Sequence, residues 1–366
     1  MTEEQSLRSP SLLRTPQALP IPNFIGTFMG RDALSAVPSL MNLEPGDTIL
    51  LPAYLCGEVV RPFLGRCLVE FYEIGEDLTV DPNDIEERLQ ATKAKAVLII
   101  NYFGFLQPFR SEIQKTCHIF GATLIEDCAH SLLTAGSGKT GDISIYSLRK
   151  HLPLPDGGGL TVSSNCRRAN LQFHSASRSN TLSILSSLKS LLRLNSARLS
   201  RAGLSGQPQA PSCGNIQPSK APPRRILPLS TFAFNGFGNA DLAAITSRCR
   251  ADYEFWYETV SAVKTLRPVF RELPVGVCPL GFPVLAEDRT AIKEKFAAGG
   301  IHLKVYWNLP PVVPTAFRTS HRLAQQVFTL PTYPDLRPAQ RQIIAALVQS
   351  LSNSRAELRS GELVRC

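Results

Sequence analysis

The chain has 366 residues, of which 43% are hydrophobic and 19% charged, a composition that excludes an intrinsically disordered protein and allows two domains. Its formal net charge is +9, but residues 167–230 contain ten Lys and Arg and no acidic residue, so the rest sums to about −1. A basic groove through the fold would not distribute charge in this way, and we therefore expect no nucleic-acid partner.

The N-terminal segment 1–23 is predicted to be an extension that precedes the first domain. Its first fifteen residues are polar and lack the apolar core of a signal peptide. No apolar run anywhere reaches the roughly 18 residues of a membrane span. Nine scattered cysteines without a C-x-x-C pair fit reduced thiols, so we expect a cytoplasmic protein. The histidines and cysteines lack ligand spacing, and no metal is expected.

Short apolar runs alternate with helical patterns through a large domain at 24–166. Near-continuous apolar strands between helices predict an α/β fold with a mostly parallel sheet covered on both faces. Ligands bind where such strands end. The predicted strands are 48–51, 68–72, 96–100, 122–125, 143–146 and 160–162, and the predicted helices are 82–91 and 109–120.

The segment 167–230 is a basic insertion rich in Ser and then in Pro, with five prolines between Gly203 and Arg225. Leu185, Leu188 and Leu192 recur at helical spacing among basic residues, which predicts an amphipathic helix. Residues 179–225 can cover a hydrophobic face of a dimer, lie on an anionic membrane or dock an acidic partner. A family-variable insertion packed on the protein is the plainer alternative.

The remaining segment, 231–366, is predicted to form a smaller α+β domain with a connecting helix. The connecting helix is expected over 241–263 and a closing helix over 338–351. Between them, apolar segments at 281–285 and 302–306 flank a helix at 289–298.

Two strand ends in the large domain carry reactive side chains. The first is Ile125-Glu-Asp-Cys-Ala-His-Ser131, and the second is Ser147-Leu-Arg-Lys-His151, which continues to the turn Asp156-Gly-Gly-Gly159. A carboxylate at a strand end can bind a metal, a ribose or a protonated ring nitrogen. Each motif alone is weak, because strand-end Asp residues are often structural and an exposed Lys is usually a solvated charge.

Taken in order, these motifs resemble the DegT/DnrJ/EryC1/StrS family of sugar aminotransferases, which depend on pyridoxal 5'-phosphate (PLP). The resemblance covers roughly residues 24 to 350 without the basic insertion. Further matching segments are Phe28-Met-Gly-Arg-Asp-Ala-Leu34, Pro45–Tyr54, Asn101-Tyr-Phe-Gly104, Gly281–Leu285, Gly300-Ile-His302 and Leu330–Leu336. It implies PLP-dependent transferase fold type I, with a seven-stranded, mostly parallel sheet in a PLP-binding domain.

The resemblance also implies roles for residues at the two strand ends. Lys150 matches the family's Schiff-base lysine, whose amine condenses with the cofactor aldehyde and then shuttles a proton. Asp127 matches the residue that keeps the pyridine nitrogen protonated. His130 occupies the position of a Gln or His near the ring and its phenolic oxygen. Ser147 matches a phosphate-binding hydroxyl.

Four further cofactor-binding positions follow from the same resemblance. Gly30 and Arg31, at the start of a helix, would offer backbone N–H groups to the phosphate. Cys56 stands where relatives often place an aromatic residue that stacks on the ring, and Tyr54 is the nearest aromatic. Asn235 matches part of an Asn-Tyr-Arg element that reaches the partner subunit's site, but the arginine is absent.

Other motifs have competing interpretations. Gly136-Ser-Gly-Lys-Thr140 looks like the end of a P-loop, but the required earlier glycine is Leu133, and a hairpin turn before Gly141-Asp142 fits better. His151 suggests the family's dehydratase branch, in which histidine replaces the lysine, although Lys150 is present. Tyr306 and Trp307, with Lys304, either line the substrate side of the cleft or pack in the small domain.

The function implied by the resemblance is transfer of an amino group, from glutamate, to a keto sugar attached to a nucleotide. A homodimer is implied as well, because sites in this fold are assembled across a dimer interface. Three alternatives remain open from the sequence: sugar dehydration, transamination of a non-sugar ketone, and a regulatory or scaffolding protein without catalysis.

Overall fold

The computed structural model describes residues 19–164, 226–334, 336 and 338–362. Its large sheet has seven strands in the order β1-β7-β6-β5-β4-β2-β3. Strands β2 to β6 pair in parallel, and β7 is antiparallel to both β6 and β1, so the predicted mostly parallel sheet is confirmed. The strands are β1 (Ile25–Thr27), β2 (Thr48–Pro52), β3 (Leu68–Tyr72), β4 (Ala96–Ile100), β5 (Thr123–Asp127), β6 (Ile143–Ser147) and β7 (Gly158–Val162).

Both faces of this sheet are covered. Every residue of β2 and β4 is buried, and since successive side chains of a strand point to opposite faces, neither face is open to water there. Helix α1 (Gly30–Leu40) packs on β6 and β7, α3 (Pro82–Thr92) packs on β3, and α4 (Arg110–Ile119) packs on β4 and β5. A short helix, α2 (Gly57–Val60), follows β2.

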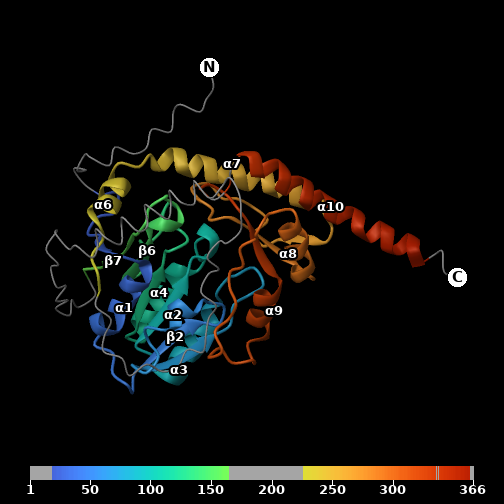
Figure 1. The fold of residues 1–366 in the computed structure, drawn as a ribbon. Helices are drawn as coiled ribbons and strands as arrows, with labels where there is room; N and C mark the ends of the chain where they lie inside the picture. Colours follow the sequence, from blue (N-terminus) through green and yellow to red (C-terminus); the bar gives the residue numbers. More distant parts are fainter. Residues whose placement is uncertain (1–18, 165–225, 335, 337, 363–366) are drawn as a thin grey trace.

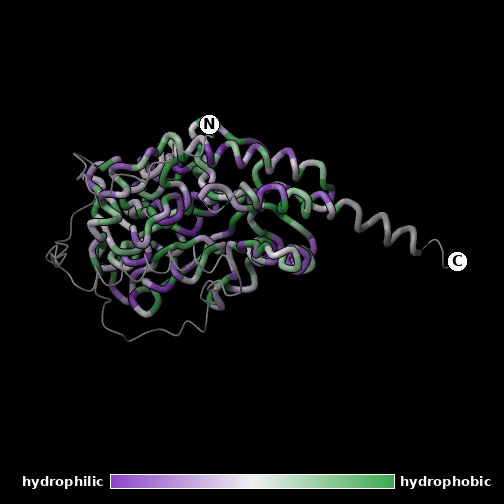
Figure 2. The backbone as a smooth tube through the Cα atoms, turned by 45° about the horizontal axis from the view of Figure 1, so that its top comes forward, coloured by the Kyte–Doolittle hydropathy of each residue, from purple (hydrophilic) through white to green (hydrophobic). Residues whose placement is uncertain are grey.

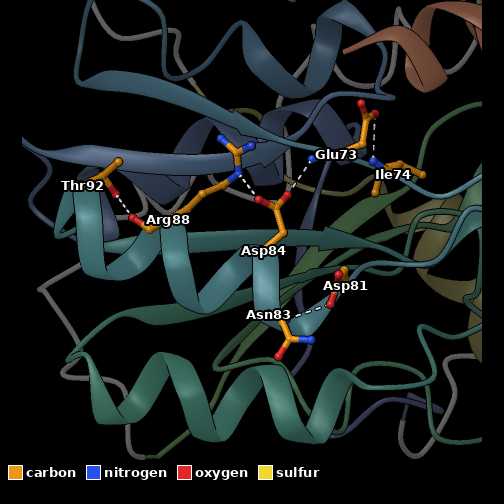
Figure 3. Close-up of polar contacts among 7 residues, drawn as sticks. All are labelled: Glu73, Ile74, Asp81, Asn83, Asp84, Arg88 and Thr92. Atoms are coloured by element: carbon orange, nitrogen blue, oxygen red, sulfur yellow. Dashed lines mark hydrogen bonds and ion pairs between the residues drawn. The ribbon is translucent and has the colours of Figure 1, made fainter. Parts of the chain in front are cut away.

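Polar contacts fix the start of α3 (Figure 3). The Asp81 carboxylate accepts a hydrogen bond from the Asn83 N–H at 2.9 Å, and Pro82 occupies the first helical position, where an N–H is not needed. Asp84 accepts from the Glu73 N–H and pairs with Arg88 one turn later at 2.6 Å. These bonds connect the helix to the segment that follows β3.

The C-terminal part forms a second, smaller sheet of three antiparallel strands in the order β10-β9-β8. Long helices α7 and α10 lie side by side along this part, and α10 extends beyond the body of the molecule (Figure 1). The elements are α6 (Thr231–Gly238), α7 (Leu242–Ser261), β8 (Leu266–Pro268), β9 (Phe282–Ala286), α8 (Arg289–Ala298), α9 (Arg318–Gln326), β10 (Val327–Leu330) and α10 (Pro338–Glu362).

Helix α7 shows why the helical periodicity of this region was informative. Its buried residues recur every three or four positions, at Ile245, Cys249, Tyr253, Trp256 and Val260, so one face packs on the protein while the other meets water. The tube in Figure 2 changes between hydrophobic and hydrophilic colours along the long helices accordingly.

One local expectation was wrong. The segment 136–142 is not a hairpin, because β5 and β6, which it connects, are parallel. The apolar segment 302–306 forms one isolated bridge, between Lys304 and Thr329. The basic insertion at 167–230 lies almost entirely outside the described residues, and its helix and the domain limits drawn around it stay predictions. Within the described residues, no helix is both long and apolar enough to cross a membrane.

Candidate active site

Adjacent parallel strands bring the two reactive segments to one edge of the sheet. Asp127 is the last residue of β5 and pairs with Ile100 of β4 on one side and Ile145 of β6 on the other, while Ser147 ends β6. A cavity of about 230 Å³ opens at this edge. Because this volume lies below the roughly 300–1,000 Å³ of drug-sized ligand pockets, it suits a single-ring ligand.

Seven of the nine predicted site residues line this cavity. They are Gly30, Arg31, Cys56, Asp127, His130, Ser147 and Lys150. Trp307 lines it as well, in keeping with the cleft interpretation of that segment, whereas Tyr306 and Lys304 line a separate small cavity. Tyr54 and Asn235 are outside the lining. Both are buried, Asn235 on α6.

Lys150 ends a 3₁₀ turn, Leu148–Lys150, directly after β6. The side chain is partly buried, and its Nζ lies 5.6 Å from the centre of the Tyr306 ring. Burial lowers the pKa of Lys150 to about 8, and the charges of Lys304 and Arg149 act in the same direction, while Cys56 and Asp127 oppose them. The neutral, nucleophilic fraction of this amine near neutral pH is therefore much larger than that of an ordinary lysine.

Asp127 is 7% exposed, and burial raises the pKa of its carboxyl group. The Ala129 N–H, which donates to Oδ1 at 2.9 Å, and the charge of Lys150 lower that pKa in part. A buried carboxylate that accepts few hydrogen bonds from the protein binds a protonated ring nitrogen well. The N–H of the ring donates to the carboxylate, and the opposite charges of the two groups stabilise each other.

His130 lies beside Asp127 and is 2% exposed. Its Nδ1 accepts a hydrogen bond from the Phe103 N–H at 3.2 Å, and its ring centre lies 5.2 Å from that of Trp307. Burial, then the charges of Lys150 and His151, hold the pKa of His130 well below its usual range. The imidazole is thus neutral, with Nε2–H available as a donor.

Tyr54 acts behind the cavity instead of lining it. Its hydroxyl donates to the backbone carbonyl of Tyr306, and its ring centre lies 5.6 Å from that of Trp307. It also accepts, through its own carbonyl, a hydrogen bond from the Tyr102 hydroxyl at 2.6 Å. Tyr54 therefore supports the segment that carries Trp307, and its expected role at the ring stays a prediction.

The predicted close approach of backbone at the glycine turn is present. A Cβ atom at Gly158 would lie 2.0 Å from the carbonyl carbon of Met29, so only glycine fits beside the start of α1. A Cβ atom at Gly30 would lie 3.1 Å from the Tyr146 carbonyl oxygen. The first turn of α1 is thereby held against the end of β6, with its N–H groups near Ser147.

The P-loop-like segment binds a side chain of the protein itself. The fully buried Glu126 carboxylate accepts hydrogen bonds from the N–H groups of Gly138, Thr140 and Gly141 at 2.9–3.2 Å. It also accepts from the Asn101 amide at 2.8 Å. Since these backbone donors are already used, the segment offers no cradle for a nucleotide phosphate, in agreement with its interpretation as a turn.

His151 is fully buried and does not line the cavity that contains Lys150. Neither of its ring nitrogens has a hydrogen-bond partner among residues 19–164, 226–334, 336 and 338–362. The histidine is therefore a neighbour of the reactive lysine and does not replace it.

Sequence reasoning missed three polar or soft side chains at the mouth of the cavity, those of Met29, Glu58 and Arg149. The position of Arg149 between Ser147 and Lys150 was the available signal. Within the described part of the chain, no group of three His, Cys, Asp or Glu side chains is placed to hold a metal ion.

Comparison with known proteins shows which family the segment with most of the cavity-lining residues resembles. Residues 23–181 match the model of the DegT/DnrJ/EryC1/StrS aminotransferase family. The chain is 31% identical over 144 residues to GDP-perosamine synthase from Vibrio cholerae, and this match spans 37% of the chain and 38% of that relative.

Solved structures extend the likeness to the whole fold. A DegT DnrJ EryC1 StrS aminotransferase from Brucella abortus superposes with a TM-score of 0.64 over 92% of this chain and 87% of its own, at 18% identity. The PLP form of the putative sugar aminotransferase Spr1654 from Streptococcus pneumoniae has a TM-score of 0.63 over 91% and 87% of the two chains, at 15% identity. The fold is thus that of the family's aminotransferases.

Proposed function

We propose that this chain is a PLP-dependent aminotransferase that transfers an amino group, from glutamate, to a keto sugar attached to a nucleotide. The observation that carries the proposal is that Lys150 and Asp127, from adjacent parallel strands, line one cavity of single-ring size. Both lie in the segment 23–181 that matches the model of an aminotransferase family, and a structural neighbour was solved in a PLP form.

The residues of the cavity fit this cofactor. Asp127 would hold the ring nitrogen, His130 would donate to an oxygen on the ring, and the first turn of α1 with Ser147 would face the phosphate. When bound, PLP supplies a carbonyl carbon that reacts with amines and a ring that accepts electron density.

The chain's own groups would bind and move protons. Because its pKa is lowered to about 8, the Lys150 amine would be able to hold the carbonyl carbon of the cofactor, and it would accept a proton from a substrate carbon and return it to another. Asp127 keeps negative charge beside the ring nitrogen. Trp307 and His130, whose ring centres lie 5.2 Å apart, close one side of the cavity against water.

The substrate and the assembly are also part of the proposal. A nucleotide-linked sugar is suggested by the name of the Vibrio cholerae relative, which belongs to a protein that this chain matches over 38% of its length. We propose a homodimer in which Asn235, outside the lining of its own cavity, contributes to the partner's site. Dehydration is disfavoured because His151 does not face the cavity.

An absorbance titration followed by a transfer assay tests the proposal. The purified protein with PLP should absorb near the visible edge, and added glutamate should bleach that band. The bleached protein should then convert one member of a panel of nucleotide-linked keto sugars to an amino sugar, detected by mass spectrometry. A protein that stays colourless with excess PLP would refute the cofactor assignment, and bleaching without any amino sugar would refute the substrate class.

A further inference from the structure

Two arginines from distant segments meet at the mouth of the candidate active site. Arg31 lies in the first turn of α1, and Arg149 lies in the 3₁₀ turn between Ser147 and Lys150. Both line the same cavity as Lys150. The resemblance to the family assigned Arg31 only a backbone contact and assigned Arg149 nothing, so the side chains of both call for an explanation.

Neither guanidinium group has all its donors occupied by partners in the described part of the chain. Arg31 Nη1 lies 3.7 Å from Glu58 Oε2, but Glu58 makes a closer pair with Arg61, at 3.0 Å. Arg31 Nε is buried, and no described residue forms a hydrogen bond with it. Arg149 Nη1 lies 3.4 Å from the thioether sulfur of Met29, a weak acceptor, and no carboxylate among the described residues lies within ion-pair distance of Arg149.

The two positive charges lie close enough to affect each other. Partial burial lowers the pKa of Arg149, and the charge of Arg31 lowers it further, with Asp156 opposing. Holding two like charges at one cavity mouth is unfavourable unless an anion lies between them. Gly30 and Arg31, the first two residues of the 11-residue helix α1, line the same cavity, and Ser147 adds a hydroxyl to its lining.

We propose that the side chains of Arg31 and Arg149 bind the phosphate group of the cofactor. A phosphate dianion offers three acceptor oxygens, and guanidinium groups donate to it in pairs. The proposal rests on the function proposed above and adds to it a cationic clamp made by one chain. One carboxylate oxygen of Glu58 lies near Arg31 and would keep the Arg31 side chain in place at the cavity mouth.

Binding of PLP and of pyridoxal, which lacks the phosphate, separates this role from a general effect on the site. Equilibrium dissociation constants are measured by absorbance for the full chain and for Arg31→Gln, Arg149→Gln, Arg149→Lys and Arg61→Gln. Arg61 is the matched control, because it pairs with Glu58 without lining the cavity. Thermal unfolding of each variant without cofactor checks that it folds.

Loss of one charge-assisted contact should weaken PLP binding by about 10-fold to 100-fold in Arg31→Gln and Arg149→Gln. Pyridoxal binding should change by less than about 2-fold, Arg149→Lys should recover part of the loss, and Arg61→Gln should behave as the unaltered protein. Unchanged PLP binding in Arg149→Gln, or equal weakening for PLP and pyridoxal, would overturn the proposal.

Binding of inorganic phosphate tests the two arginines even if the protein does not bind PLP. Should the unaltered protein bind neither PLP nor pyridoxal, the proposed function is refuted. The arginines are then judged by thermal stabilisation with phosphate, which Arg149→Gln should lose and Arg61→Gln should keep. Equal stabilisation of all three proteins, or none, would refute the clamp independently.

Discussion

Two turns that contain glycine lie near opposite ends of strand β6 and differ in what their backbone N–H groups face. The turn at Gly138–Gly141 directs its backbone N–H groups at the buried carboxylate of Glu126. The turn at the start of α1 lies beside an open cavity with Lys150 and Ser147. The backbone N–H groups of a turn are therefore open to a bound anion only where the protein has not supplied a carboxylate of its own.

The largest expected effect is the loss of activity when Lys150 is replaced. Lys150→Ala should reduce amino-group transfer by about 10²-fold to 10⁴-fold, because it removes both the nucleophile and the group that moves the proton. Single-turnover transfer from glutamate measures the change. Activity within a few-fold of the unaltered protein would show that another group does this work.

The contacts between the turn at Gly138–Gly141 and Glu126 should contribute to the free energy of unfolding. Glu126→Ala leaves three backbone N–H groups and the Asn101 amide without their acceptor and should lower the free energy of unfolding by roughly 3 kcal/mol. Urea unfolding measures it, with Glu87→Ala on the exposed face of α3 as the control. A loss of less than about 1 kcal/mol would mean that this carboxylate contributes no more than a surface group.

The open site should respond to pH. Because the pKa of Lys150 is lowered to about 8, the neutral amine increases as pH rises through that value, and the rate of PLP incorporation into the cofactor-free protein should rise and then level. In Asp127→Asn the midpoint should move to lower pH, since a negative charge that raises the pKa of Lys150 is gone. Stopped-flow absorbance across this pH range measures both, and an unshifted midpoint would contradict the electrostatic coupling.

The smallest expected effect is at the lysine of the P-loop-like turn. Lys139 is exposed, and its replacement by Ala should change stability by less than about 0.5 kcal/mol and leave PLP binding unaltered. Chemical unfolding and the absorbance titration check this. A marked loss of PLP binding in Lys139→Ala would reverse the comparison between the two turns.

Sequence reasoning predicted the large sheet well, because β2, β4 and their neighbours are buried runs whose limits agree with the structure within about two residues. It missed short or mixed elements, such as β8 and α9, whose form depends on tertiary packing more than on local pattern. The parallel pairing of β5 and β6, which excludes a hairpin at 136–142, is a long-range fact that a local turn motif does not contain.

For the site, motif spacing selected seven residues that do line one cavity. It did not predict the contact of the Tyr54 hydroxyl with the Tyr306 carbonyl, since that partner lies far along the chain. It also did not predict a role for the Arg149 side chain, because only the fold shows that Arg31 lines the same cavity.

The most direct measurement is reduction of the PLP-loaded protein with borohydride, followed by peptide mapping by mass spectrometry. We predict a pyridoxyl phosphate adduct on the peptide that contains Lys150 and on no other. An adduct on Lys139 or on any other lysine, or no adduct on a protein saturated with PLP, would contradict the central claim that Lys150 carries the cofactor.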